Sequence, residues 1–265
     1  MITTVLFDIY GTLLDVITDE ESLGAFDILS RWLEYKRAYI TPEQLRWFYK
    51  EEFARRLGMP ERQRAETDLF MSMAGQPFAR GTALFLDADV VDVFRTILTS
   101  CCGLEGAEPD HLPEDCAHLF RAATRKDIFL YPTVKPALAL IKKGYKLGIV
   151  SNAQEAFTMP ELDLYHLRPY FEEIVLSSQA GVRKPNPMIF QRALDNLGAG
   201  PHQAVFVGND LIVDILGARR LGMKTILVGP GDPNVRGVVP DATVRDVNFY
   251  EVKNIVDRWN EQEKT

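Results

Sequence analysis

The stretch that decides the fold is residues 4–14, Thr4-Val-Leu-Phe-Asp-Ile-Tyr-Gly-Thr-Leu-Leu14. Its first four residues are β-branched or apolar, which predicts a short strand that is buried on both faces. Asp8 follows the strand at once, and Gly11 lets the backbone turn back closely. In open α/β sheets, ligands bind beyond the carboxyl ends of the strands. Asp8 is therefore a candidate nucleophile or metal ligand, unless it only begins a turn.

Three later strands also end in polar residues. The predicted strand 146–150 is followed by Ser151 and Asn152, and the strand 173–176 is followed by two serines and then by Lys184 in an Arg-Lys-Pro-Asn-Pro run. The strand 204–207 leads into Gly208-Asn-Asp-Leu-Ile-Val-Asp214. A hydroxyl, a lysine and an acidic cluster thus join Asp8, each after a hydrophobic strand.

The segment after Asp15 has helical periodicity for about a hundred residues. Thr41-Pro-Glu43 is typical of a helix start, because it offers a cap, a proline at the first helical position and an early acid. The apolar spacing predicts helices over 22–35, 42–57, 89–98 and 113–125, with a connection at 76–81.

From Tyr131 onward, strands and helices alternate, which predicts a parallel sheet with helices on both faces. The predicted fold is an α/β, Rossmann-like three-layer core with an inserted all-helical cap. The core comprises residues 1–16 and 128–265 and the cap residues 17–127, with hinges near 15–18 and 126–132. Further strands are expected at 225–228 and 243–247, and further helices at 134–143, 154–167, 187–197, 212–222 and 249–259.

Composition excludes several classes of protein. The net charge of −7 and the lack of a basic run argue against nucleic-acid binding. No run of about 18 apolar residues predicts a membrane span, and the sequence starts without a secretory signal pattern. Three cysteines do not make a disulfide framework. We therefore expect a cytoplasmic protein that does not bind membranes; the oligomeric state stays open.

The four motifs in this order resemble the haloacid dehalogenase-like hydrolase superfamily. The resemblance covers about residues 1–16 and 128–230, and the segment between them matches only as a helical insert. It implies that Asp8 is the nucleophile, which forms a covalent aspartyl intermediate. It also implies that Thr12 and Ser151 are hydroxyl donors, that Asn152 with Ser151 binds a phosphate at a helix start, and that Lys184 shields the transferring group.

The fourth motif bears on metal dependence. Mg²⁺ prefers oxygen ligands in a near-octahedral arrangement, usually one or two carboxylates with phosphate and water. Asp8, the Tyr10 carbonyl and an oxygen from Asn209 or Asp210 would supply them, with Asp214 in support. The chain departs from the usual phosphatase pattern here, because Asn209 stands where phosphatases have aspartate. The alternative is that these residues only cap the helix that follows.

Tyr10 is the sharper departure from the phosphatase pattern. Phosphatases of this superfamily carry a second aspartate at that position as general acid, whereas Asp-x-Tyr-Gly-Thr-Leu resembles 2-haloacid dehalogenases, which need neither acid nor metal. The acid cluster instead favours a phosphatase. The sequence therefore predicts an Mg²⁺-dependent phosphatase that acts on a small anionic phosphomonoester. The alternatives are a metal-free 2-haloacid dehalogenase and a weakened member that binds a phosphorylated ligand or a protein.

Overall fold

A computed structural model of the chain describes residues 1–58, 85–104, 111–230 and 237–263, so the connection predicted at 76–81 lies outside the described residues. One parallel six-stranded sheet forms the centre, in the order β5-β4-β1-β6-β7-β8. All five predicted core strands after the first are present; β5 has its predicted ends, and the other four have ends shifted by one to three residues. The strands are β1 (Thr4–Phe7), β4 (Lys146–Ser151), β5 (Glu173–Leu176), β6 (Ala204–Gly208), β7 (Lys224–Val228) and β8 (Ala242–Val244).

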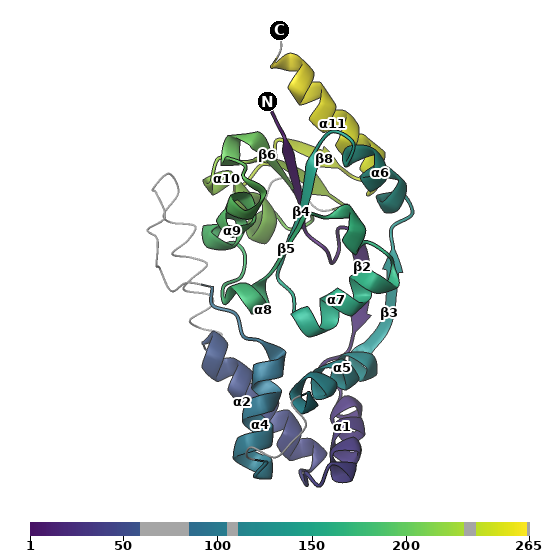
Figure 1. Cartoon of the computed structure of the whole chain (residues 1–265), viewed down its shortest axis with the longest axis vertical. Helices are drawn as coiled ribbons and strands as arrows, with labels where there is room; N and C mark the ends of the chain where they lie inside the picture. The colour runs from purple at the N-terminus through teal and green to yellow at the C-terminus, as the bar shows by residue number, and fades with distance from the viewer. Residues whose placement is uncertain (59–84, 105–110, 231–236, 264–265) are drawn as a thin grey trace.

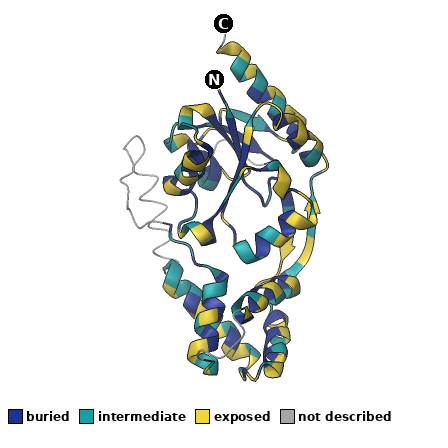
Figure 2. Ribbon diagram, in the orientation of Figure 1, coloured by how far each residue is buried: buried dark blue, intermediate teal, exposed yellow. Residues whose placement is uncertain are grey.

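Helices cover both faces of this sheet (Figure 1). The central strand β1 alternates its side chains: Val5 and Phe7 pack in the cluster with α6, α7 and α11, whereas Leu6 packs with α9 and α10. The strands are buried along most of their length (Figure 2). The predicted three-layer Rossmann-like core is therefore confirmed. The helices are α6 (Val134–Ile141), α7 (Glu155–Leu164), α9 (Pro187–Leu197), α10 (Gly217–Arg220) and α11 (Phe249–Gln262).

The inserted segment forms a separate helical body beyond the carboxyl ends of the strands (Figure 1). Its own core centres on packed rings, with Phe120 4.9 Å from Tyr49 and 5.3 Å from Phe26 between ring centres. The predicted start at Thr41 is confirmed, because Thr41 and Gln44 form a capping box. The described cap helices are α1 (Leu23–Tyr35), α2 (Pro42–Leu57), α4 (Val90–Cys102) and α5 (Leu112–Thr124).

A two-stranded antiparallel ribbon joins the cap to the core. It consists of β2 (Leu14–Thr18) and β3 (Arg125–Leu130). The expectation that helical structure begins directly after Asp15 is therefore wrong, and both predicted domain boundaries fall inside this ribbon. The sequence hides the ribbon because its strands lie far apart in the chain and are largely exposed, with Ile17 and Phe129 facing solvent. Burial thus imposes no clear alternation on either strand.

Two elements near the end of the core also differ from the prediction. The helix expected over 212–222 is a π-helix, η3 (Leu211–Leu216), followed by α10. The Ile215 amide donates to the Asp210 carbonyl, which is the i to i+5 spacing of a π-helix. The strand expected over 243–247 ends at Val244, and Val247 has a φ of 49°, which is incompatible with an extended strand. Short elements complete the described fold: α8 (Ser177–Ala180), η1 (Arg168–Tyr170) and η2 (Pro201–Gln203).

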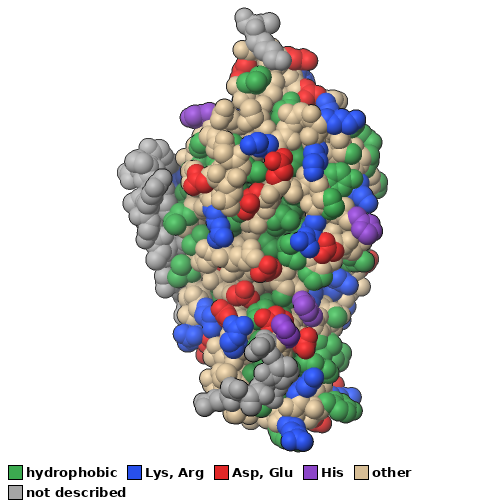
Figure 3. Space-filling model, viewed as in Figure 1, with side chains coloured by type: hydrophobic (Ala, Val, Ile, Leu, Met, Phe, Trp, Pro, Cys, Tyr) green, Lys and Arg blue, Asp and Glu red, His purple; other side chains and the backbone are tan. Residues whose placement is uncertain are grey.

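The surface carries charges of both signs. On the face in Figure 3, lysine and arginine side chains are interspersed with aspartate and glutamate among the described residues. Within the described part of the chain, no helix combines the length and apolarity that a bilayer crossing needs. The absence of nucleic-acid binding stays a prediction from the charge.

Candidate active site

Asp8 lies at the carboxyl end of β1, where the motif residues converge. Its amide donates to the Val207 carbonyl at 2.9 Å, which extends the sheet pairing to the site. Its carboxylate oxygen Oδ1 accepts hydrogen bonds from the Ser151 hydroxyl at 2.8 Å and from the Lys184 ammonium at 2.6 Å. The other oxygen, Oδ2, lies 3.4 Å from the Thr12 hydroxyl. Four predicted site residues from three separate motifs therefore meet at one carboxylate.

Lys184 is fully buried between two carboxylates. Its Nζ lies 2.6 Å from both Asp8 Oδ1 and Asp214 Oδ1. Burial alone would lower the pKa of this ammonium, but the charges of Asp214 and Asp8 raise it above its usual value. The Asn152 side chain binds the Lys184 backbone on both sides. Asn152 Oδ1 accepts from the Lys184 amide at 2.6 Å, and Asn152 Nδ2 donates to the Lys184 carbonyl at 3.1 Å. Asn152 therefore positions the lysine loop.

Asp214 braces the loop after β6. While Oδ1 binds Lys184, Oδ2 accepts from the backbone amides of Asn209 and Asp210, each at 3.0 Å. Gly208 permits this approach, because a Cβ at that position would lie 2.4 Å from Asp214 Oδ2. Burial raises the pKa of Asp214 to about 6, and the nearby Asp8 charge adds to the rise while Lys184 opposes it. Both carboxylate oxygens are thus engaged inside the protein.

The side chains of Asn209 and Asp210 have different surroundings, whereas the sequence left open which of them would bind the metal. Asp210 Oδ1 accepts from the Ile212 and Val213 amides at 2.8 and 2.7 Å, so this side chain caps the helix that follows. The Asn209 side chain instead packs against Gly11: a Cβ added to Gly11 would lie 2.4 Å from Asn209 Nδ2. Asn209 Oδ1 lies 3.4 Å from the Thr12 hydroxyl. Asn209 is therefore the one of the pair that lies beside the Asp8 loop.

Tyr10 belongs to a buried polar network that the sequence did not predict. Its hydroxyl donates to Glu161 Oε2 at 2.5 Å and lies 3.1 Å from the Thr158 hydroxyl. Burial and the Glu161 carboxylate raise the Tyr10 pKa well above 10. Burial would also raise the pKa of Glu161, but Arg121 and its other partners bring it below the usual value. Tyr10 is thus held as a neutral hydroxyl beside a carboxylate.

Arg121 ties this network to the cap. From α5, its Nε donates to Glu161 Oε1 at 2.8 Å, and Arg125 of β3 lies 3.1 Å from the same oxygen. The Arg121 guanidinium also stacks over the rings of Tyr10 and Phe157, at 5.6 and 5.2 Å from their centres. No sequence motif includes Arg121 or Glu161, because each lies within a helix and apart from the four motifs at the strand ends. Their importance arises from contact across the cap–core boundary.

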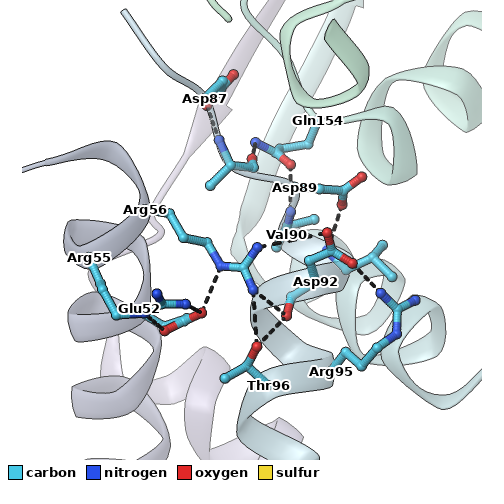
Figure 4. Close-up of polar contacts among 12 residues, drawn as sticks. Glu52, Arg55, Arg56, Asp87, Asp89, Val90, Asp92, Arg95, Thr96 and Gln154 are labelled. Atoms are coloured by element: carbon cyan, nitrogen blue, oxygen red, sulfur yellow. Dashed lines mark hydrogen bonds and ion pairs between the residues drawn. The ribbon is translucent and has the colours of Figure 1, made fainter. Parts of the chain in front are cut away.

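A second cap–core contact reaches the lysine and serine loops. Gln154 follows Ser151 by three residues, and its side-chain amide donates to the Ala88 carbonyl and accepts from the Val90 amide, each at 2.8 Å (Figure 4). On the other side of this cap segment, the Asp87 amide donates to the Gly181 carbonyl at 3.0 Å. The start of α4 and the residues just before it are therefore bonded to the loops that carry Ser151 and Lys184.

Comparison with known families identifies the chain. A family model described as a haloacid dehalogenase-like hydrolase matches residues 2–222. The chain belongs to the haloacid dehalogenase-like hydrolase family. The resemblance found in the four motifs is thereby confirmed.

Two curated relatives of this chain are phosphatases by name. Glyceraldehyde 3-phosphate phosphatase of Methanopyrus kandleri is 38% identical over 117 residues, which cover 42% of this chain and 50% of that protein. Phosphoglycolate phosphatase of Aquifex aeolicus is 33% identical over 146 residues, which cover 53% and 68% respectively. The chain spans half or less of the length of the first curated relatives that it matches.

Solved structures of both a phosphatase and a dehalogenase share this fold. A crystal structure of a HAD phosphatase from Thermococcus onnurineus matches with a TM-score of 0.56 and 24% identity, covering 96% of this chain and 98% of that one. A crystal structure of a 2-haloacid dehalogenase from Pseudomonas syringae pv. Tomato matches with a TM-score of 0.61 and 23% identity, covering 98% of this chain and 100% of that one. At this identity the likeness shows the fold alone. The reaction must be argued from the residues of the site.

Proposed function

We propose that this protein hydrolyses a small phosphomonoester in an Mg²⁺-dependent reaction through an aspartyl-phosphate on Asp8. The observation that carries the proposal is the arrangement around this carboxylate. One oxygen is fixed by Ser151 and Lys184, and the other faces Thr12 beside Asn209. The retained Asp214 and the phosphatase names of the relatives support the same reaction class.

The donor set fits a hard cation. Within the described residues, no group of three histidine, cysteine or acidic side chains could hold a metal ion alone, so amide and carbonyl oxygens would have to contribute. We propose Asp8, the Tyr10 carbonyl and Asn209 as direct ligands, because Asp210 caps a helix and both oxygens of Asp214 are engaged. Asp214 would act by orienting the Asn209 backbone. Bound Mg²⁺ would supply charge neutralisation for the phosphoryl group.

The remaining steps use side chains of this chain. Asp8 attacks phosphorus, a P–O bond forms, and the bond to the leaving oxygen breaks. Lys184 offsets negative charge next to Asp8, and the Ser151 and Thr12 hydroxyls can donate to the phosphoryl oxygens. Water then attacks phosphorus of the aspartyl-phosphate, the bond between phosphorus and the Asp8 oxygen breaks, and inorganic phosphate leaves while the Asp8 carboxylate is restored. The cap covers the strand ends and would exclude bulk water during the first step.

Phosphate release should require Mg²⁺ and stop in EDTA. The Asp8 and Asp214 carboxylates lie on one ammonium, so the site keeps an excess negative charge that a divalent cation would relieve. The measurement is phosphate release from a phosphomonoester panel with and without Mg²⁺, in parallel with halide release from 2-chloropropionate. Halide release in EDTA without phosphate release would establish the dehalogenase instead.

Two variants test which residue holds the metal. Asn209→Asp adds a negative charge beside the Asp8 loop and should lower the Mg²⁺ concentration that gives half-maximal activity. Asp210→Asn keeps a good helix cap and should leave that concentration within about twofold of the wild-type value. If Asp210→Asn instead raises it strongly, Asp210 is the ligand and our assignment is wrong.

Tyr10 should make turnover depend strongly on the leaving group. A positioned general acid contributes about 10²–10⁴-fold when the leaving group is poor, and Tyr10 is a weak acid because burial and Glu161 raise its pKa. We therefore expect kcat/KM for aryl phosphates to exceed that for alkyl phosphates by a wide margin. Tyr10→Asp should narrow this gap, and the control Tyr10→Phe should preserve it. The measurement is kcat/KM against leaving-group pKa; a flat dependence in the wild type would show that another residue donates the proton.

The second candidate function is 2-haloacid dehalogenation, which one observation favours. Tyr10 occupies the position of the phosphatase acid, and its hydroxyl donates to the Glu161 carboxylate. Halide needs no proton to leave, so this arrangement would cost a dehalogenase nothing. The halide assay in EDTA described above decides between the two reactions.

A further inference from the structure

A cavity of about 500 Å³ lies between the cap and the core next to the candidate active site. Tyr10 and Asn152 line it from the core. Tyr10 is two residues from Asp8, and Asn152 follows Ser151, whose hydroxyl binds the Asp8 carboxylate. Pockets of roughly 300–1,000 Å³ hold drug-sized ligands. The space therefore exceeds what a two- or three-carbon leaving group would fill.

The basic side chains that line this cavity are already paired with carboxylates. Among the described lining residues these are Lys50 and Arg121. Lys50 forms an ion pair with Glu21, whose side chain also lines the cavity. Arg121 binds Glu161 at 2.8 Å and lies 3.4 Å from Glu20. Two carboxylates, Glu20 and Glu21, also line the cavity, so its described charged groups balance and their negative side chains would repel a carboxylate on the substrate.

Aromatic rings supply part of the walls of the cavity. Tyr49 and Phe53 come from cap helix α2, with ring centres 4.8 Å apart, and Phe157 comes from core helix α7. Phe157 is held in place by Arg121, which lies 5.2 Å from its ring centre. Rings from both bodies thus face a common space, and such rings bind flat apolar groups by stacking and edge contacts.

We infer that the preferred substrate is a phosphomonoester whose leaving group carries an uncharged ring and no carboxylate. This inference rests on the proposed function, since it assigns the cavity to the leaving group of the reaction at Asp8. It separates this protein from a relative that is named for phosphoglycolate, whose leaving group is a small carboxylate. The ring would lie between α2 and α7, with the phosphoryl group at the strand ends.

Binding of two matched phosphonates tests the inference without requiring turnover. 2-Phenylethylphosphonate and 3-phosphonopropionate differ in whether a phenyl ring or a carboxylate follows the same two-carbon link. Calorimetric titration of the full chain in Mg²⁺ should show tighter binding of the phenyl compound by about tenfold, as expected from burying one ring against aromatic walls. Equal affinity, or tighter binding of 3-phosphonopropionate, would overturn the inference.

Three variants assign the preference to the cavity. Phe53→Ala should weaken binding of the phenyl compound by about 3- to 10-fold and leave 3-phosphonopropionate unchanged. Phe48→Ala is the matched control, because Phe48 lies on the same helix and packs on Trp47 but is not among the cavity-lining residues. Glu21→Gln removes the partner of Lys50 and should tighten binding of 3-phosphonopropionate. Equal effects of Phe53→Ala and Phe48→Ala would refute the role of the cavity.

Hydrolysis of the matching phosphates is a separate measurement. Benzyl phosphate and 2-phosphoglycolate both release an alcohol, so their comparison does not depend on the proton chemistry at Tyr10. If the phenyl phosphonate binds more tightly but no phosphate is released from either ester, the proposed function fails and the ligand preference stands. If phosphate is released with 2-phosphoglycolate preferred, the proposed function stands and the substrate class is wrong.

Discussion

Asp8→Asn is expected to reduce turnover by about 10⁴-fold or more, because it removes the nucleophile and with it the covalent route. Asparagine has the same shape and its amide oxygen can still accept from Ser151, so the fold should persist. Lys184 also keeps Asp214 as a partner at 2.6 Å. The measurement is kcat at saturating substrate, together with circular dichroism and the thermal unfolding midpoint of the variant.

The control for this prediction is Asp210→Asn, which makes the same chemical change at an exposed carboxylate that caps a helix. It should keep most of the wild-type turnover, because asparagine is an equally good cap. Turnover retained by a folded Asp8→Asn protein would remove Asp8 from the mechanism.

Lys184→Met should lower both activity and stability. The ammonium is the shared partner of the Asp8 and Asp214 carboxylates, and methionine of similar length leaves the two charges buried together. Breaking a buried pair in this way costs about 3–5 kcal/mol, which corresponds to roughly 6–20 °C in the unfolding midpoint of a chain of this size. Phosphate release should fall by about 10³-fold, because charge neutralisation next to the nucleophile is lost.

Two further variants test whether repulsion between the Asp8 and Asp214 carboxylates causes the loss of stability. Lys146→Met makes the same change at an exposed lysine whose ammonium binds the Leu197 carbonyl, and should alter stability by about 0.5 kcal/mol or less. The double variant Lys184→Met/Asp214→Asn also removes one of the two buried carboxylates that lose their ammonium partner. It should recover part of the stability but none of the activity. If the double variant is less stable than Lys184→Met, repulsion between the carboxylates is not the cause.

The convergence of the candidate site residues was predictable from sequence because their positions follow from a single rule. Asp8, Ser151 and Lys184 each come after a run of apolar residues, and parallel strands bring such positions to one edge of the sheet. The strand 173–176 was predicted with its observed ends, because short hydrophobic runs bounded by polar residues have few other solutions in an alternating α/β chain. The roles of the site residues remain predictions until the variants are measured.

The cap–core boundary was not predictable from sequence in the same way. Strands β2 and β3 form a ribbon only by pairing with each other across the whole insert, and neither has a buried face that would impose alternation. The contact of Gln154 with Ala88 and Val90 likewise joins segments that no local pattern relates. Such contacts depend on how the cap docks, which local periodicity does not encode.

The sequence alone determined the fold class, the helical insert and the residues at the strand ends, because hydrophobic periodicity and strand-end position are local properties of the chain. Only the tertiary structure decided how these residues are used. It places Lys184 between two carboxylates, turns Asp210 into a cap while Asn209 lies beside Gly11, and binds Tyr10 to Glu161. The contacts of Lys184, Asn209 and Tyr10 join atoms from different elements, so packing sets their distances. The Asp210 cap is local to η3, and the structure only decided that this side chain caps the helix while Asn209 lies beside the Asp8 loop.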